Sequence, residues 1–130
     1  MQEMCQDIKD IDLDVTEKTF QTNIISMFAM SKYALKHMNR GDTIVNSASV
    51  ASYMSNPTLL DYASTKGAIV TFTRGLAQQQ AKNGIRVNAV APGIMCVNYT
   101  SLNILNADYT IVGRLCNQQL ITIRQRLWIL

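Results

Sequence analysis

A tyrosine, a lysine and a serine near the middle of the chain have the spacing of an acid–base site. Tyr62 and Lys66 are four residues apart, and Ser49 lies thirteen positions before Tyr62. The apolar residues that follow Tyr62 recur at helical spacing, which predicts that Tyr62 and Lys66 share one face of a helix, near its first turn. Residues Thr43 to Asn46 have the character of a short buried strand, so Ser49 should emerge close to the end of that strand. A hydroxyl, a phenol and an ammonium are then expected to converge on one point.

Proton transfer to or from an alcohol or a carbonyl is the chemistry that such a trio suggests. A free tyrosine has a pKa of about 10, so a tyrosine that acts as a base at neutral pH needs its phenolate stabilised by about 3 to 4 kcal/mol. The ammonium of Lys66 and the N-terminus of the helix would both favour the phenolate of Tyr62. Ser49 could hold the substrate oxygen by a hydrogen bond while Tyr62 exchanges its proton. A Tyr-x-x-x-Lys pair is also common on ordinary helix surfaces, and by itself the pair leaves a purely structural interpretation open.

A long helix is expected before the strand. An apolar stripe predicts that it runs from about Asp14 to Asn39, with Asp14 and Glu17 forming a capping box at its start. Gly41 supplies the stop signal. Asn23 lies inside this helix although asparagine is a poor helix former, so it is either a solvated surface residue or a residue kept for another purpose.

A second helix and a second strand follow the serine-rich loop. The helix is predicted from about Asp61 to Asn83, and the strand from Gly84 to Ala91 is apolar enough for a parallel strand buried on both faces. A strand, a helical crossover and a strand predict a parallel pair. Pro92 and Gly93 would then lie at the carboxyl end of a strand, where open α/β sheets bind their ligands, although Pro-Gly is also a common plain turn.

Three phrases of the sequence closely resemble the catalytic half of the short-chain dehydrogenase/reductase family. They are Ile-Val-Asn-Ser-Ala-Ser, which ends at Ser49, Tyr-Ala-Ser-Thr-Lys-Gly-Ala, which begins at Tyr62, and Gly-Ile-Arg-Val-Asn-Ala-Val-Ala-Pro-Gly, which ends at Gly93. The resemblance extends from about Ile11 to Gly93, nearly two thirds of the chain. It implies an α/β fold, a partial Rossmann-like parallel sheet with long flanking helices that forms the second half of a short-chain dehydrogenase.

The resemblance also implies a reaction, in which a hydride passes between a nicotinamide and a carbonyl or alcohol carbon of a small molecule. Tyr62 would transfer the proton, Lys66 would lower the pKa of the phenol and grip the cofactor ribose, and Ser49 would position the substrate oxygen. In the family, the asparagine at the position of Asn23 distorts its helix and binds, through its backbone carbonyl, a water connected to the lysine. Asn23 would therefore complete a proton relay.

The implied cofactor is NAD or NADP. In the family, the turn that corresponds to Pro92 and Gly93 contacts the nicotinamide end of the cofactor. Related enzymes pair their two long helices across a dimer interface, so a homo-oligomer is expected by analogy.

Two departures from the family decide how far its function can be carried over. No Gly-x-x-x-Gly-x-Gly or Gly-x-Gly-x-x-Gly turn, which would cradle the cofactor diphosphate, occurs in the chain. The likeness also stops at Ile94, and Val97 stands near the place where the family has a cofactor-binding threonine. We therefore expect a loop or disordered lead at residues 1–13, a catalytic segment at residues 14–93 and a divergent tail at residues 94–130. The composition of the tail is that of an out-of-frame translation product, and a frameshifted or truncated chain is the hypothesis that follows.

Composition narrows the class of protein. The net charge of +3 is modest and the Lys and Arg residues are dispersed, so nothing in the chain calls for nucleic acid. No apolar run reaches transmembrane length, and no secretory signal is visible, so neither a membrane partner nor export is expected. The three cysteines lack metal-ligand spacing and fit reduced thiols, which indicates the cytoplasm and predicts no metal site.

Two functional hypotheses follow from different classes. In the first, the chain is an NAD(P)-dependent oxidoreductase of the short-chain type. In the second, it is a truncated, non-catalytic remnant, or a subunit that needs a nucleotide-binding half from elsewhere, because hydride chemistry requires a held cofactor.

Overall fold

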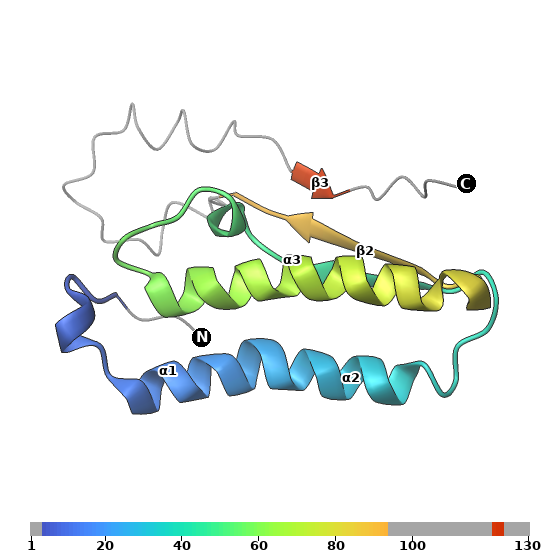
Figure 1. Ribbon diagram of the computed structural model, residues 1–130, viewed down its shortest axis with the longest axis horizontal. Coiled ribbons are helices and arrows are strands. Elements are labelled where there is room, and N and C mark those ends of the chain that lie inside the picture. Colours follow the sequence, from blue (N-terminus) through green and yellow to red (C-terminus); the bar gives the residue numbers. More distant parts are fainter. Residues whose placement is uncertain (1–3, 94–120, 124–130) are drawn as a thin grey trace, which may run out of the picture.

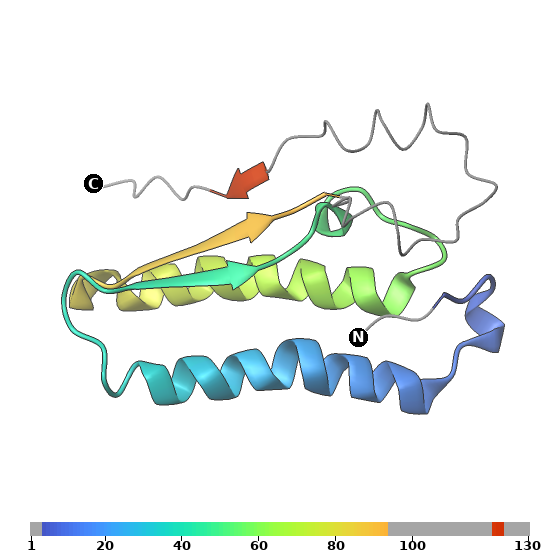
Figure 2. The same cartoon turned by 180° about the vertical axis from the view of Figure 1, so that it is seen from behind.

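The computed structural model describes residues 4–93 and 121–123, in which long helices lie on one side of a small sheet (Figures 1 and 2). The longer elements are α1 (Leu13–Phe20), a π-helical segment η2 (Gln21–Ile25), α2 (Ser26–Ala34), β1 (Thr43–Ser47), α3 (Leu60–Gln80), β2 (Arg86–Ala91) and β3 (Ile121–Ile123). Three short 3-10 turns complete the described chain: η1 (Ile8–Asp10), η3 (Val50–Ser52) and η4 (Ala81–Asn83). The predicted α/β class is confirmed.

The N-cap of the first long helix, Asp12, lies two residues before the predicted cap, Asp14. Asp12 has an extended backbone, and its carboxylate accepts hydrogen bonds from the N–H groups of Asp14 (2.8 Å) and Val15 (3.3 Å). The predicted capping box at Asp14 and Glu17 is therefore wrong, because Asp14 already lies inside the first turn. An aspartate just before a helix accepts hydrogen bonds from backbone amides that have no partner within the helix. Asp12 and Asp14 can both do this, and the sequence alone did not distinguish them.

The same helix ends at Ala34, short of the predicted Asn39. The N–H of Lys36 bonds the carbonyl of Tyr33, and the N–H of His37 bonds that of Ala34. These i to i−3 bonds tighten the chain into turns, so the α-helical ladder stops there.

The sheet has the order β1-β2-β3. β1 and β2 pair in parallel, with Thr43 opposite Arg86 and Ser47 opposite Val90, which confirms the predicted parallel unit. β3 pairs with β2 in the antiparallel sense, with Val90 opposite Thr122.

The second strand is shorter and less enclosed than predicted. Gly84 does not belong to it, because its φ of +69° is the left-handed conformation that ends η4. An added Cβ at Gly84 would lie 2.6 Å from Cγ of Arg40, so space as well as conformation favours glycine. Within β2, Val87, Ala89 and Ala91 are buried while the alternate residues are half-buried or exposed. The prediction of burial on both faces is therefore wrong for the described residues, since their long helices cover one face.

The hydrophobic core lies between α3 and the strands. Ile69 and Val70 of α3 pack with Ala48, Ala89 and Ala91, and the helical residue Ile24 joins the same cluster. Alanines on the strands allow α3 to approach the sheet closely. The predicted helix is confirmed here, although it begins at Leu60 and its last turn, η4, is a 3-10 turn.

Three threonines on the helices are completely enclosed, and each hydroxyl bonds a carbonyl of its own helix. The donors and acceptors are Thr19 to Val15 (2.9 Å), Thr65 to Tyr62 (2.7 Å) and Thr73 to Ile69 (2.7 Å). The hydroxyl of Thr73 also accepts a hydrogen bond from the side-chain amide of Asn46 on β1, at 2.9 Å. Because a buried polar group without a partner is costly, this bond fixes the helix on the strand.

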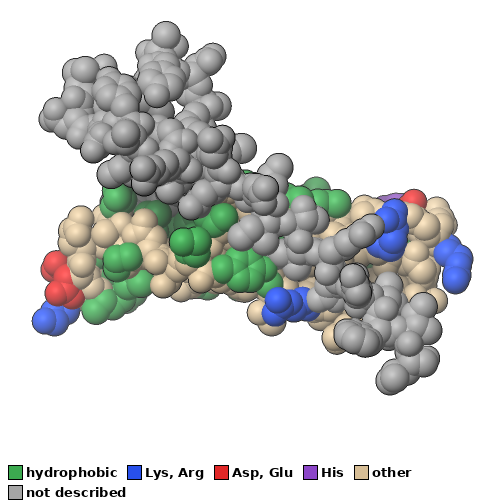
Figure 3. All heavy atoms as spheres, turned by 90° about the horizontal axis from the view of Figure 1, so that it is seen from above, with side chains coloured by type: hydrophobic (Ala, Val, Ile, Leu, Met, Phe, Trp, Pro, Cys, Tyr) green, Lys and Arg blue, Asp and Glu red, His purple; other side chains and the backbone are tan. Residues whose placement is uncertain are grey.

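None of the helices among the described residues is long and apolar enough to cross a membrane. Those residues also hold no group of three or more His, Cys, Asp or Glu side chains that could bind a metal ion. On the part of the surface that they form in Figure 3, Lys and Arg side chains lie at separate places and do not form one stripe.

Thr73→Val tests the polar anchor between α3 and β1. The variant keeps the shape of the side chain but leaves the amide of Asn46 without its acceptor, so the free energy of unfolding should fall by about 1 to 3 kcal/mol. Thr71→Val is the matched control, because Thr71 is an exposed residue of the same helix. Urea unfolding monitored by circular dichroism measures both, and an equal loss in the two variants would contradict the anchoring role.

Candidate active site

The first turn of α3 presents Tyr62 beside a buried carboxylate. Asp61 is buried, and its side chain accepts a hydrogen bond from the N–H of Tyr62 at 2.6 Å. Leu59 is the N-cap residue, directly before the helix begins at Leu60. Its side chain makes no capping hydrogen bond, and its carbonyl accepts from the N–H of Ala63 at 2.8 Å. The acidic residue therefore supports the N-terminus of the helix from inside its first turn, as the helix dipole favours.

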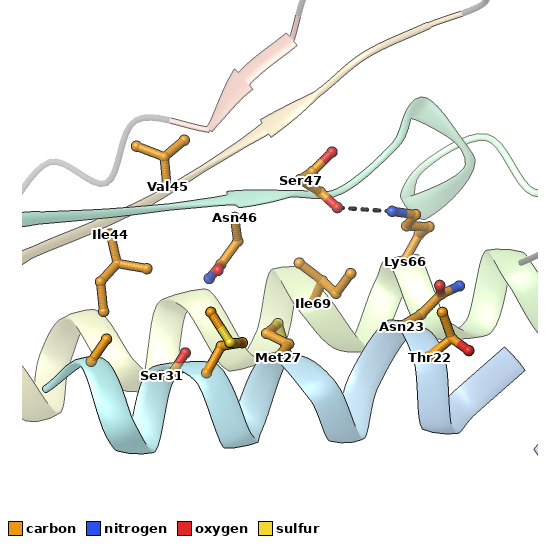
Figure 4. Close-up of a pocket in the computed structure, with 12 residues that line it drawn as sticks. Thr22, Asn23, Met27, Ser31, Ile44, Val45, Asn46, Ser47, Lys66 and Ile69 are labelled. Carbon is orange, nitrogen blue, oxygen red and sulfur yellow. Dashed lines mark hydrogen bonds between the residues drawn. The ribbon is translucent and has the colours of Figure 1, made fainter. Parts of the chain in front are cut away.

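Lys66 lies one turn further along the same face. Its ammonium is 5.5 Å from the centre of the Tyr62 ring and donates a hydrogen bond to the carbonyl of Ser47, at 2.9 Å (Figure 4). The predicted approach of the lysine to the phenol is thus present, and the last residue of β1 holds the ammonium there. Burial lowers the pKa of Lys66 from its ordinary value, because a half-buried ammonium loses part of its hydration.

Asn23 sits in the π-helical segment, where the resemblance implies a distorted helix. Its side-chain amide donates to the hydroxyl of Thr65 at 3.0 Å, and that hydroxyl donates to the carbonyl of Tyr62. Asn23 and Lys66 lie at the same end of the groove in Figure 4. A wider helical turn changes the direction of a side chain, and here the amide reaches across to α3.

Ser49 stands in the loop directly after β1. It is buried and extended, and its hydroxyl oxygen accepts from the N–H of Ala51 at 3.1 Å, which caps the short turn η3. An oxygen that accepts in this way keeps its own proton to donate to another acceptor.

The chain on either side of Ser49 is joined to the end of β2. The N–H of Ala48 bonds the carbonyl of Val90 at 2.8 Å, and the N–H of Val50 bonds that of Pro92 at 3.0 Å. The Pro92-Gly93 turn therefore lies beside Ser49, at the carboxyl ends of both strands. Val97, which stands near the place of the family's cofactor-binding threonine, lies outside the described residues.

The contacts connect the predicted residues in two groups. Lys66 is joined to Tyr62 and to the end of β1, and Ser49 is joined through its neighbours to Pro92. The approach of the Ser49 hydroxyl to the Tyr62 hydroxyl stays a prediction.

Two contact residues escaped the prediction from sequence. Ser47 contributes a backbone carbonyl, which no side-chain pattern announces. Thr65 accepts the hydrogen bond from Asn23. Its position could have been predicted, because a residue three positions after Tyr62 faces the same side of the helix.

A groove of about 430 Å³ runs from this site along the outer edge of β1 (Figure 4). Asn23, Ser47 and Lys66 lie at its site end, and Met30, Ala34 and Ile44 line it further along. Two of the predicted site residues, Asn23 and Lys66, thus border a concave surface that could admit a ligand or another chain.

The sequence is similar to those of known short-chain dehydrogenases. A sequence model of the family described as short chain dehydrogenase matches residues 2–104. The glucose and ribitol dehydrogenase homolog 2 of Arabidopsis thaliana is 59% identical over 86 residues, which cover 66% of this chain and 30% of the relative. The chloroplastic NADPH-dependent aldehyde reductase 1 of the same plant is 57% identical over 86 residues, with the same coverage. The chain therefore spans about a third of the length of these curated relatives.

Solved structures share the arrangement of helices and strands. The structure titled ElxO with NADP bound superposes with a TM-score of 0.69 at 35% identity, over 72% of this chain and 39% of that one. A short chain dehydrogenase from Burkholderia cenocepacia in complex with NADP has a TM-score of 0.71 at 26% identity, over 86% of this chain and 44% of that one. Because the family match spans most of the sequence and the fold agrees with it, this chain belongs to the short-chain dehydrogenase/reductase family.

Proposed function

We propose that this chain carries the proton-transfer site of an NAD(P)-dependent oxidoreductase, which interconverts a carbonyl and an alcohol of a small molecule. The observation that carries the proposal is the position of the Lys66 ammonium, between the ring of Tyr62 and the carbonyl of Ser47. A plain surface pair would not have its ammonium half-buried at the end of a strand. The relative named as an NADPH-dependent aldehyde reductase and the neighbours titled with NADP or NADH support the same class of reaction.

Tyr62 acts as the acid in reduction and as the base in oxidation. Its hydroxyl gives a proton to the substrate oxygen as the alcohol forms, and the phenolate takes that proton in the reverse direction. The Lys66 ammonium lowers the energy of the phenolate by its positive charge. Ser49 donates its hydroxyl proton in a hydrogen bond to the substrate oxygen, which holds that oxygen beside Tyr62.

Asn23 is a positioning residue in this proposal. Its amide bonds Thr65, whose hydroxyl in turn bonds the carbonyl of Tyr62, so the first turn of α3 is tied to the π-helical segment. By resemblance to the family, the backbone carbonyl of Asn23 is the proposed far end of a proton relay to Lys66.

The residues fit one end of the dinucleotide. When bound, NAD(P) would supply or accept the hydride, and its nicotinamide and ribose would be held by Tyr62, Lys66, Pro92 and Gly93 at the carboxyl ends of the strands. The described part of the chain has no glycine turn at the carboxyl ends of the strands that could bind the diphosphate of the cofactor. Its two glycines with positive φ, Gly41 and Gly84, precede β1 and β2 and therefore lie at the amino ends of the strands.

That mismatch favours a second candidate function, a chain that is non-catalytic alone and serves as a subunit or remnant. The sequence has no Gly-rich diphosphate turn, and the chain spans about 30% of the length of its Arabidopsis relatives. The relatives' remaining length leaves room for such a turn.

The two long helices are the proposed contact between copies of the chain. Phe28 on α2 packs against Phe72 of α3 with the rings tilted by 59° and their centres 4.5 Å apart, yet Phe28 remains 52% exposed. Tyr33 on α2 is exposed as well. Large apolar side chains that are exposed to solvent are candidates for burial in an oligomer. We also propose a cytoplasmic location for the protein.

Tyr62→Phe tests the acid–base role. The variant removes the exchangeable proton and keeps the ring, so the rate of hydride transfer to a carbonyl substrate should fall by at least ~100-fold while the fold is retained. The rate is followed by the absorbance of NADPH or NADH against a panel of aldehydes and ketones. Tyr33→Phe, at an exposed tyrosine of α2, is the control and should leave the rate unchanged. Equal rates in Tyr62→Phe and wild type would remove the assignment.

The lowered pKa of Lys66 makes stability depend on pH in a defined direction. The unfolded chain has the ordinary pKa of 10.5 and so binds more protons than the folded chain between the lowered value and 10.5. The contribution of Lys66 to the free energy of unfolding therefore rises with pH across that window.

The comparison that measures this effect is wild type against Lys66→Met, by urea unfolding at a series of pH values. As the pH rises towards 10.5, wild type should gain stability relative to Lys66→Met, which cannot titrate at this position. Lys82→Met is the control at an exposed lysine and should show no such trend. If the difference in free energy of unfolding between wild type and Lys66→Met does not change with pH, the ammonium of Lys66 is not buried as described.

Equilibrium dialysis with NADPH and with NADH separates the two candidate functions. Saturable binding by the purified chain, weakened by Lys66→Met, is the expected result for an oxidoreductase that holds its own cofactor. No binding of either nucleotide would favour the subunit or remnant, because hydride transfer requires a held cofactor.

A further inference from the structure

Lys66 differs from the other lysines of the chain in its surroundings. All the lysines lie within the described residues, and they are Lys9, Lys18, Lys32, Lys36, Lys66 and Lys82. Lys66 is partly buried, whereas each of the others is exposed. It is also the one charged side chain among the described residues that line the groove. A molecule that enters the groove therefore meets a single amine.

The contacts of Lys66 leave most of its hydrogen-bonding capacity unused. An ammonium has three N–H groups, and the bond to the carbonyl of Ser47 uses one of them. The ring of Tyr62 is the other partner that the described residues provide. No carboxylate among those residues pairs with Lys66, so no negative charge holds the nitrogen in its protonated form.

The groove beyond Lys66 suits an apolar chain. Met27 and Met30 lie about one and two helical turns after Asn23, and Ile44 projects from β1 toward the helices (Figure 4 labels Asn23, Met27 and Ile44). Met30 is 72% exposed, so the described residues leave this apolar surface uncovered. Because methionine side chains are flexible, they adapt to ligands of different shape.

Burial supplies the reactive form of this amine. Only a neutral amine has a lone pair that can attack a carbonyl carbon. Because burial lowers the pKa of Lys66 from its ordinary value of 10.5, a larger share of Lys66 is neutral at a given pH than of a fully solvated lysine.

We infer that Lys66 captures aldehydes that carry an apolar chain, as a protonated imine at the end of the groove. The nitrogen forms a bond to the aldehyde carbon, and the carbonyl oxygen leaves as water with the two hydrogens of the neutral amine. The C=N group that remains takes up one proton from solvent. No electrons are transferred to or from the aldehyde, so this activity needs no nucleotide and goes beyond the proposed hydride transfer.

The contacts of the ammonium also fit the product. A protonated imine keeps one N–H and its positive charge. The N–H can donate to the carbonyl of Ser47, and the charge stays over the ring of Tyr62, whose centre is 5.5 Å from Nζ. The chain of the aldehyde would lie along Met27 and Met30. Imine formation therefore keeps both contacts that hold Lys66 at the end of β1.

Reductive trapping tests the inference. The purified 130-residue chain is incubated with octanal and sodium cyanoborohydride without any nucleotide, and mass spectrometry of its peptides locates the alkylated lysines. The reductant converts each imine into a stable secondary amine. Lys66 should be alkylated at least ~10-fold faster than Lys82, an exposed lysine that serves as the control in the same molecule.

A shorter aldehyde and a variant test the role of the groove. Acetaldehyde has no long chain to bury, so it should show a weaker preference for Lys66 over Lys82 than octanal does. Met30→Gln makes the wall polar at similar size and should lower the preference shown by octanal by at least ~3-fold. Met54→Gln is the matched control, because Met54 is also exposed but does not line the groove. Circular dichroism verifies that both variants are folded.

Three results would overturn the inference. They are equal rates of alkylation at Lys66 and Lys82 with octanal, a preference for Lys66 that is the same with acetaldehyde, and a preference that persists when urea unfolds the chain. The outcome does not depend on the proposed oxidoreductase, because no nucleotide is present. Alkylation at Lys66 in a chain that neither binds NADPH nor reduces aldehydes would support the imine and contradict the proposed hydride transfer.

Discussion

Helix α3 is held on the strands at two polar points. Near its middle, the amide of Asn46 bonds the hydroxyl of Thr73, and near its start the ammonium of Lys66 bonds the carbonyl of Ser47. Between them, small and branched side chains fill the space between helix and sheet. Apolar packing alone tolerates some sliding, whereas a buried amide that must meet one hydroxyl allows a single register. The position of Tyr62 relative to the strand ends follows from that register.

The π-helical segment η2 connects the first long helix to α3 by hydrogen bonds. A stretch of π-helix turns Asn23 toward Thr65, and Thr65 passes the contact on to the backbone of Tyr62. Threonine suits this place because its hydroxyl can donate to a carbonyl of its own helix and accept from a neighbour at once. The first turn of α3 is thereby fixed from both sides, by the strand end and by the π-helical segment.

The candidate site lies where both strands end. The carboxyl ends of β1 and β2 meet the first turns of α3, so Lys66 and the loop that carries Ser49 lie at the same edge of the sheet. On the other side of β1, the described structure offers an open edge and an apolar groove. The matched residues make up about a third of the length of the relatives.

Local spacing in the sequence was enough to predict the parts of the structure that depend on neighbours along the chain. The four-residue interval between Tyr62 and Lys66 determines that they share a helical face, and the strand-helix-strand pattern determines that β1 and β2 are parallel. The family phrases around Ser49 and Gly93 predicted the class of fold for the same reason, because each consists of consecutive residues that form a strand and the chain just after it. Only the tertiary structure decided that β2 is fully buried on one face, because this burial depends on α3 and other groups distant in the chain. It also decided that a backbone carbonyl, at Ser47, holds the lysine, since every residue has a carbonyl and only the packing of α3 on β1 selects one of them.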